Sequence, residues 1–165
     1  MIHINNDIAR RLDFKKPETW LATWGGSGLM APAPGTWGTL AGLPVGILLM
    51  ILGGPVHLVV GIVLVTAAGW WATGQVEAMT GDHDGGYIVI DEVAGVWIAL
   101  LAASPTPLSV ILAFLLFRAF DIVKPFPCNW LDQKLTGAAS VMLDDIAAGL
   151  YAALCLIGLR YVGLG

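Results

Sequence analysis

Long apolar segments separated by glycine and proline constrain this chain more than any other feature. Five apolar runs follow a polar N-terminal segment, and they span residues 38–52, 56–73, 93–103, 108–120 and 146–162. Breaks rich in glycine or proline separate the first pair at 53–55 and the second pair at 104–107. Glycine and proline are more frequent in membrane helices than in soluble ones. The pattern predicts an all-α fold: a compact helical bundle of about five main apolar helices in an integral membrane protein.

The composition agrees with a chain that has little water-exposed surface. Of its 165 residues, 57% are hydrophobic and 12% are charged, whereas soluble domains carry about 25% charged residues. The length predicts a single domain over 1–165, with 1–20 as a polar N-terminal segment. The net charge of −4 argues against a nucleic-acid partner. The two cysteines form no motif, so no cysteine-based zinc site is indicated.

Three of the five apolar runs are short for a membrane span. A spanning helix needs about 20 apolar residues, with about 17 as the lower limit, and the runs 38–52, 93–103 and 108–120 fall below it. Such runs can extend into flanking residues, form a re-entrant hairpin or be buried helices. The sequence leaves these alternatives open.

The basic residues predict an orientation. Four of them lie in the N-terminal segment, and cytoplasmic segments are rich in Lys and Arg. Five crossings that begin in the cytoplasm place residues 74–92 and 118–145 on the same side. Every acidic residue then lies at or near this face, and the opposite face has none. We therefore expect a functional site at the cytoplasmic interface.

The first acidic group is the doublet Asp91-Glu92, with Asp84 upstream. It stands directly before an apolar run, where one carboxylate would serve as a helix cap or interact with the helix dipole. A doublet exceeds what capping needs. Because ionisable residues at a membrane-embedded position are usually functional, the doublet indicates a site.

A second group is Arg118, Asp121 and Lys124, spaced along one side of a helix. Pro125 disfavours helical geometry at Lys124, so the helix should end there. A salt-bridged helix end explains Lys124 well but Asp121 poorly. Asp121 follows thirteen mostly apolar residues and should lie close to the bilayer, which indicates function.

Asp144 and Asp145 form a third group at the start of the last apolar run. Either could cap that helix, but adjacent carboxylates repel each other and need a cation to offset the repulsion. A fourth candidate is the loop that opens the first apolar helix, with Thr36 and Gly38. Helix N-termini bind anions through free backbone N–H groups.

Many carboxylates with few cations favour hard-metal chemistry. Oxygen ligands without a Cys or His cluster favour magnesium, manganese or calcium over zinc. A phosphate monoester would be repelled by these carboxylates unless a metal ion intervened, with Arg118 and Lys124 supplying further positive charge. This composition is typical of metal-assisted phosphoryl transfer to water.

At these residues the chain resembles the phosphatidylglycerophosphatase A family. The similar stretches are residues 31–40, 88–95, 117–127 and 142–149. The resemblance implies an all-helical, multi-pass protein of the bacterial inner membrane. It also implies a Mg²⁺-dependent phosphoric monoester hydrolase of phospholipid biosynthesis, with a phospholipid phosphate as substrate. Such an enzyme would convert phosphatidylglycerophosphate to phosphatidylglycerol and phosphate on the cytoplasmic face.

The resemblance also implies roles for individual residues. The predicted metal ligands are Asp84, Asp91, Glu92, Asp121, Asp144 and Asp145. The predicted catalytic residues are Asp91, Arg118, Asp121 and Lys124, and the predicted phosphate-binding residues are Thr36, Gly38, Arg118 and Lys124. Gly85 stands where family members often have a proline after the aspartate, which leaves the Asp84 loop less rigid.

The alternative function is a membrane cation-binding or transport protein that uses the same carboxylates. A transport pathway should reach both faces, whereas the acids here gather at one. The sequence does not decide between direct attack by water and an aspartyl-phosphate intermediate at Asp121. It also leaves open the number of metal ions, the selectivity among lipid phosphates and the oligomeric state.

Overall fold

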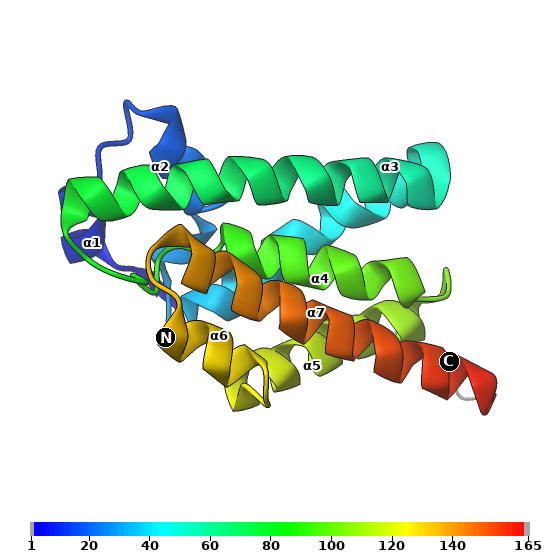
Figure 1. Ribbon diagram of the computed structural model, residues 1–165. Helices are drawn as coiled ribbons and strands as arrows, with labels where there is room; N and C mark the ends of the chain where they lie inside the picture. The colour runs from blue at the N-terminus through cyan, green and yellow to red at the C-terminus, as the bar shows by residue number, and fades with distance from the viewer. Residues whose placement is uncertain (1, 164–165) are drawn as a thin grey trace.

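Helices make up most of the chain, as predicted (Figure 1). The computed structural model describes residues 2–163. Met1, Leu164 and Gly165, which the predicted single domain includes, lie outside the described residues. One departure from an all-α fold is a short antiparallel pair between β1 (His3–Ile4) and β2 (Met30–Ala31). This pair ties the N-terminal end to the segment that precedes the first long helix.

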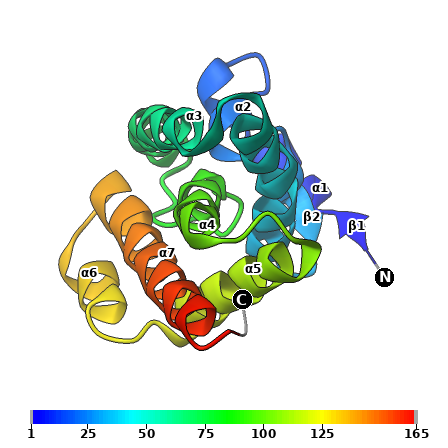
Figure 2. The ribbon, with the colours of Figure 1, turned by 90° about the vertical axis from the view of Figure 1, so that its right-hand side faces the viewer.

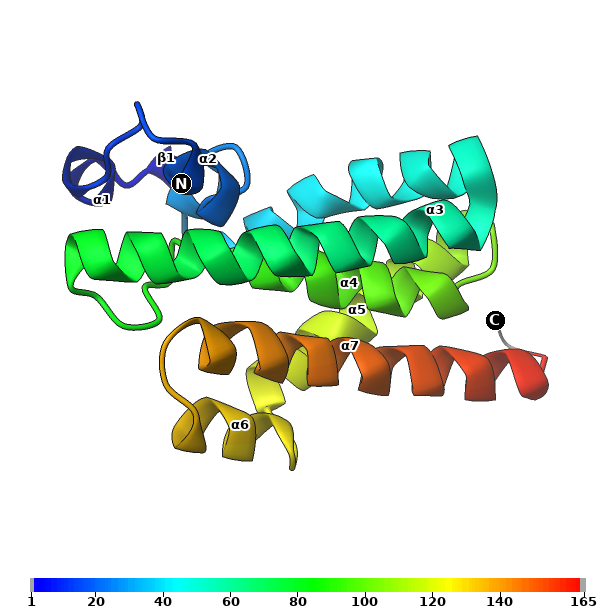
Figure 3. The same cartoon turned by 45° about the horizontal axis from the view of Figure 1, so that its top comes forward.

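The N-terminal segment folds into short elements rather than an extended polar tail. They are α1 (Asn6–Arg11), α2 (Pro17–Ala22) and the 3₁₀ helix η1 (Ser27–Leu29). The Asn5 side chain accepts a hydrogen bond from the backbone N–H of Ile8 and so caps α1. Figure 3 shows α1 and α2 beside one end of the long helix α3. The N-terminal segment therefore covers one end of the bundle.

Helix α3 (Pro34–Thr80) is a hairpin of two helical arms. Gly53 and Gly54 have non-helical backbone angles, and Gly54 has a φ of 65°, which glycine adopts without strain. The chain reverses there, so the arms lie side by side (Figures 1 and 3). The predicted runs 38–52 and 56–73 are these two arms, and the break predicted at 53–55 is confirmed.

The remaining helices are α4 (Ile90–Ala102), α5 (Pro107–Val123), α6 (Cys128–Lys134) and α7 (Ala138–Tyr161). In Figure 1 the starts of α4 and α7 lie at the same end of the bundle as the N-terminus. The break in α3, the α4–α5 connection and the end of α7 lie at the opposite end. We call the first end the acidic end, because no acidic residue occurs in 44–76, 93–120 or 146–163.

Helix α4 occupies the centre of the bundle, enclosed by α3, α5 and α7 (Figure 2). All but two of its residues are buried. At 1.5 Å per residue it is about 20 Å long, shorter than the roughly 30 Å hydrocarbon core of a bilayer. Of the alternatives for the short runs, α4 is a buried helix, whereas α5 extends beyond its run at both ends.

Glycines let the other helices approach α4 closely. Gly42 of α3 packs against Val93, and Gly46 packs against Trp97, whose indole N–H donates to the Gly42 carbonyl at 2.8 Å. On the other side, Gly95 of α4 contacts Gly149 of α7 backbone to backbone. Small residues allow this kind of contact between apolar helices. The glycine contacts therefore set the height of α7 relative to α4.

Two helices, α3 and α7, are long and apolar enough to cross a membrane by length and composition. Only 11% of the most apolar 18-residue window of α3 is buried. Its outer face is an apolar surface that no described residue covers, including Ile51, Leu52, Val56 and Val63. An exposed apolar surface of this extent is typical of contact with lipid or with another protein.

The contact between α4 and α7 generates a stability prediction. A Cβ at Gly149 would press on the Gly95 carbonyl, whereas a Cβ at Gly158 of the same helix would meet no atom within 4 Å. We expect Gly149→Ala to lower the free energy of unfolding by about 1–3 kcal/mol through overpacking and Gly158→Ala to cause no loss. Thermal unfolding in detergent, followed by circular dichroism, measures both variants. Equal melting of the two variants would show that the contact is not tight.

Candidate functional site

Three carboxylates from two helices meet at the acidic end. Asp91 and Glu92 lie in the first turn of α4, and Asp145 lies in α7. Each offers an oxygen atom, and these atoms lie within 4.8 Å of one another. Asp91 is 7% exposed and Asp145 is 4% exposed. We call these three residues the carboxylate triad.

The carboxylate triad fits a metal ion. Asp91 Oδ1 and Glu92 Oε2 are buried and have no hydrogen-bond partner among the described residues. Buried carboxylates that repel one another and lack donors are costly unless a cation offsets their charge. Their hard oxygen atoms suit a divalent ion such as Mg²⁺, Mn²⁺ or Ca²⁺. The triad can therefore hold a divalent metal ion.

An arginine and a further aspartate of α5 border the triad. Arg118 Nη1 lies 2.5 Å from Asp121 Oδ2 and 3.7 Å from Glu92 Oε1. The Asp121 carboxyl in turn lies against that of Asp145. Arg118 Nε is buried and has no hydrogen-bond partner among residues 2–163. The guanidinium thus borders the triad and has an N–H donor that no described residue accepts.

Lys124 forms the other cationic corner of the site. It ends α5 in the left-handed conformation, with a φ of 46°, and Pro125 follows it. Its Nζ lies 2.6 Å from Asp144 Oδ2 and 3.0 Å from Asp132 Oδ1. Burial lowers the pKa of Lys124, but these two carboxylates outweigh burial and raise the pKa above its ordinary value. Lys124 is therefore a cation at neutral pH.

Asp144 and Asp145 point to different parts of the site. Neighbouring helix residues project about 100° apart, so Asp145 reaches the triad while Asp144 reaches Lys124. The prediction that either could cap the last helix is wrong, because α7 begins at Ala138 and both residues lie inside it. The helix extends back through residues 138–145, which precede the apolar run. The N-cap of α4 is Val89, so Asp91 and Glu92 are not caps either.

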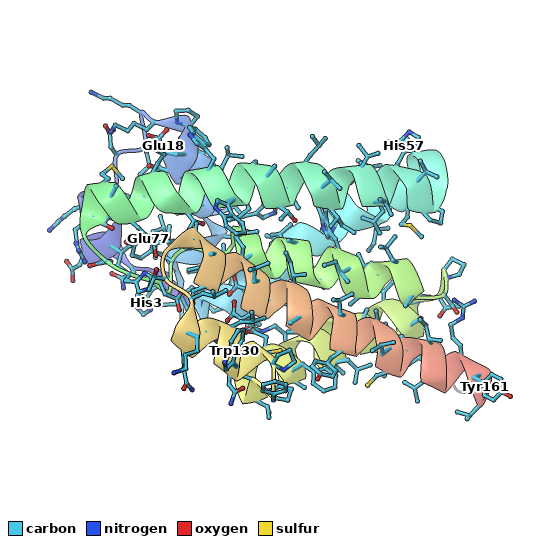
Figure 4. The ribbon with its side chains drawn as sticks, in the orientation of Figure 1. His3, Glu18, His57, Glu77, Trp130 and Tyr161 are labelled. Atoms are coloured by element: carbon cyan, nitrogen blue, oxygen red, sulfur yellow. The ribbon has the colours of Figure 1, made fainter. Side chains whose placement is uncertain are left out.

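Asp84 lies on the Lys124 side of the site, outside the triad. Its backbone N–H donates to Glu77 Oε1 at 3.0 Å, and His83 Nδ1 lies 2.8 Å from the same oxygen. Figure 4 shows Glu77 near the end of the second arm of α3. The pKa of Asp84 is raised above its ordinary value, because the effect of burial, supported by the nearby charge of Asp132, outweighs the opposing effect of Lys124. The predicted roles of Asp84, Asp121 and Asp144 as metal ligands stay predictions.

The start of α3 reaches the site through a glycine. A Cβ at Gly35 would meet Glu92 Oε1 and would lie 3.1 Å from Arg118 Nη1. Thr36 belongs to the same first turn and is partly buried, whereas Gly38 is buried against the side chain of Val89. The contact with Val89 explains the glycine at 38. Phosphate binding by Thr36 and Gly38 stays a prediction.

Sequence reasoning missed two residues of this site. Gly35 belongs to the loop that was singled out, and its position directly after Pro34 at a helix start was the available signal. Asp132 had no signal, because it stands in a short polar segment outside every apolar run. Its contact with Lys124 depends on how α6 folds back on the bundle.

Known proteins are similar in sequence to this chain over most of its length. The family model of phosphatidylglycerophosphatase A matches residues 20–160. The chain belongs to the phosphatidylglycerophosphatase A family. The match includes every residue of the carboxylate triad, together with Arg118 and Lys124. No solved structure matches the chain.

Three relatives extend the comparison. A phosphatidylglycerophosphatase A of Haemophilus influenzae is 40% identical over 94% of this chain and 96% of its own length. The phosphatidylglycerophosphatase A of Escherichia coli is 36% identical over 90% of this chain and 87% of its own. A putative phosphatidylinositol-3-phosphatase of Bacteroides thetaiotaomicron is 38% identical over 86% of this chain and 92% of its own.

The carboxylate triad generates a metal-binding prediction that needs no activity assay. A divalent ion that binds only the folded protein stabilises it by about 2.7 kcal/mol at a concentration 100 times its Kd. We expect Mg²⁺ or Mn²⁺ to raise the unfolding temperature of the wild-type protein but not that of Asp145→Asn. The exposed Asp7→Asn is the matched control and should keep the full shift. If the unfolding temperature of Asp145→Asn rose as much as that of the wild type, the triad would not be the metal site.

Proposed function

We propose that this protein is a Mg²⁺-dependent lipid phosphatase that hydrolyses phosphatidylglycerophosphate to phosphatidylglycerol and phosphate. The observation that carries the proposal is the carboxylate triad with unpaired buried oxygens, bordered by Arg118 and Lys124. A phosphate monoester needs positive charge on its oxygens, and a site with this donor set can collect it. Two relatives of similar length carry the name of this activity.

Asp91, Glu92 and Asp145 are the residues that would hold Mg²⁺. When bound, the ion supplies positive charge to phosphate oxygens and acidifies coordinated water. The protein contributes the fixed carboxylates and a buried setting. Because α4 is enclosed on all sides, the ligands have little freedom to spread apart.

Arg118, Lys124 and the first turn of α3 bind the phosphate in this proposal. Arg118 Nε has a free donor, and Gly35 brings the start of α3 beside the guanidinium. A helix N-terminus favours an anion because its dipole is positive there. Lys124 neutralises the side of the site formed by Asp144. Together they stabilise the charge of the transferring phosphoryl group.

Asp121 acts in this proposal by holding Arg118. Its carboxylate is engaged by the guanidinium, which makes it a poor nucleophile. We therefore favour attack by water: a P–O bond forms to water, the P–O bond to glycerol breaks, and the glycerol oxygen gains a proton as the water loses one. Acid quenching of a single turnover with ³²P-labelled lipid tests this, because an aspartyl-phosphate would leave label on the protein.

The protein acts at the cytoplasmic face of a bacterial inner membrane in this proposal. Helices α3 and α7 are long enough to cross, and the basic N-terminal segment favours a cytoplasmic acidic end. Exposed apolar residues flank the site there, namely Ile122, Val123, Phe126 and Trp130. Figure 4 shows Trp130 on α6. This apolar border lets the phosphate of a lipid enter while its acyl chains stay in the bilayer.

The transport alternative is less favoured. An ion pathway needs polar groups along its length, whereas the middle and far end of the bundle contain no acidic residue among the described helices. The far end carries His57 and Tyr161 (Figure 4), and the one basic residue of α7 is Arg160. The acidic residues are therefore confined to one end, which favours a local site over a pathway.

Purified protein in detergent with phosphatidylglycerophosphate and Mg²⁺ tests the function directly. We expect phosphate release that stops in EDTA, and a loss of about 10²–10³-fold in kcat for Arg118→Lys, because a planar donor set is lost. Asp121→Asn should lower kcat strongly while the protein still unfolds cooperatively. A phosphatidylinositol phosphate serves as competing substrate.

Two outcomes would contradict the proposal. Release that persists in EDTA would remove the metal from the reaction. Faster release from the phosphatidylinositol phosphate than from phosphatidylglycerophosphate would reassign the substrate to the activity named for the Bacteroides relative.

A further inference from the structure

Asp132 occupies a position in the site that no motif of the sequence indicated. It lies in α6, the short helix between α5 and α7, and its Oδ1 is 3.0 Å from Lys124 Nζ. Asp144 Oδ2 approaches the same ammonium group at 2.6 Å from another helix. Two carboxylates from separate elements thus converge on one lysine.

Helix α6 is fixed against α7, which fixes Asp132 in turn. The Ser140 hydroxyl donates to the Asp132 backbone carbonyl at 2.9 Å. Before α6, the Tyr151 hydroxyl donates to the Phe126 carbonyl at 2.7 Å. Cys128, the first residue of α6, is fully buried. Asp132 therefore approaches Lys124 from a firmly held position.

Lys124 needs such partners to have a defined position. It stands at the last turn of α5 in a left-handed conformation, so no helical neighbour directs its side chain. A lysine side chain is flexible and its ammonium group is a point charge without preferred orientation. An ammonium group has three N–H donors. Asp132 and Asp144 take two, which leaves one for a third acceptor.

We propose that Asp132 is a positioning residue that holds the Lys124 ammonium group so that its remaining N–H donates to the transferring phosphate. The inference rests on the proposed function, in which Lys124 binds that phosphate. Asp132 itself lies in α6, outside the carboxylate triad. It acts through Lys124 rather than on the substrate.

Because Asp132 is partly exposed, a substitution there can test its effect on Lys124 apart from any effect on folding. The side chains of Asp132 and Lys124 are 32% and 29% exposed, and partly exposed ion pairs contribute little to stability. Asp144 is 6% exposed in the same pair and adjoins the triad through Asp145. A change at Asp132 should therefore alter Lys124 without unfolding the bundle or emptying the metal site.

Kinetics of phosphate release from phosphatidylglycerophosphate by the full-length protein test the role. We expect Asp132→Asn to lower kcat about 10- to 100-fold, since small misplacements of a charge-stabilising group have effects of this order, with KM little changed. Asp132→Glu should recover part of the loss because it restores the charge. Asp82→Asn breaks the exposed pair with Arg11 and is the matched control, with kcat expected unchanged.

A double-mutant cycle decides whether Asp132 acts through Lys124. Lys124→Ala and Lys124→Ala/Asp132→Asn should have the same kcat, because a positioning residue has no effect once its target is gone. Unfolding temperatures of all variants, and of Asp132→Ser if Asp132→Asn unfolds, exclude loss of fold as the cause. Additive losses, or full activity of Asp132→Asn in an active wild-type background, would overturn the inference alone. An inactive wild-type protein would overturn the proposed function and the inference with it.

Discussion

The repulsion among buried carboxylates is the constraint on which the rest of the structure depends. Like charges interact several-fold more strongly in a protein interior than in water, and α4 and α7 bring three carboxylates within 4.8 Å. Arg118 and Lys124 offset part of this charge. The uncompensated part suits the acidic end to a cation, and in the proposed function a bound cation would let the same place bind phosphate. Both properties would arise from one cluster whose negative charge exceeds its positive charge.

The glycine contacts are what make this cluster possible. Gly95 and Gly149 let α4 and α7 touch backbone to backbone, four residues after Asp91 and Asp145 respectively. Because each aspartate stands one turn before its contact glycine, the contact sets the two carboxylates at the same height. The first arm of α3 uses Gly42 and Gly46 in the same way on the other face of α4. The geometry of the carboxylate triad therefore depends on the small residues of the bundle as much as on its acidic residues.

Much of this arrangement could be predicted from the sequence, for identifiable reasons. Apolar runs and the glycine–proline breaks located the arms of α3, α4, α5 and α7, because hydropathy and turn chemistry are local properties. Acidic residues beside apolar runs located the cluster, because an isolated buried charge is too costly to be incidental. The start of α7 was missed because the apolar run was taken to begin after Asp144 and Asp145, whereas the helix already includes residues 138–145. The ion pair between Asp132 and Lys124 depends on how α6 packs against α7. The spacing of residues along the chain does not predict this packing.

The two-residue break in α3 has a consequence for how the protein is made. Its arms are joined by Gly53 and Gly54 alone, so they form a hairpin whose ends must emerge on the same side. If the hairpin enters a bilayer as one unit during synthesis, a single orientation event settles the placement of Gly35 and Glu77 together. All later helices then pack against a template that is already in place. In that case the tight turn at the far end would commit the acidic end to one side of the membrane before the carboxylate triad has been synthesised.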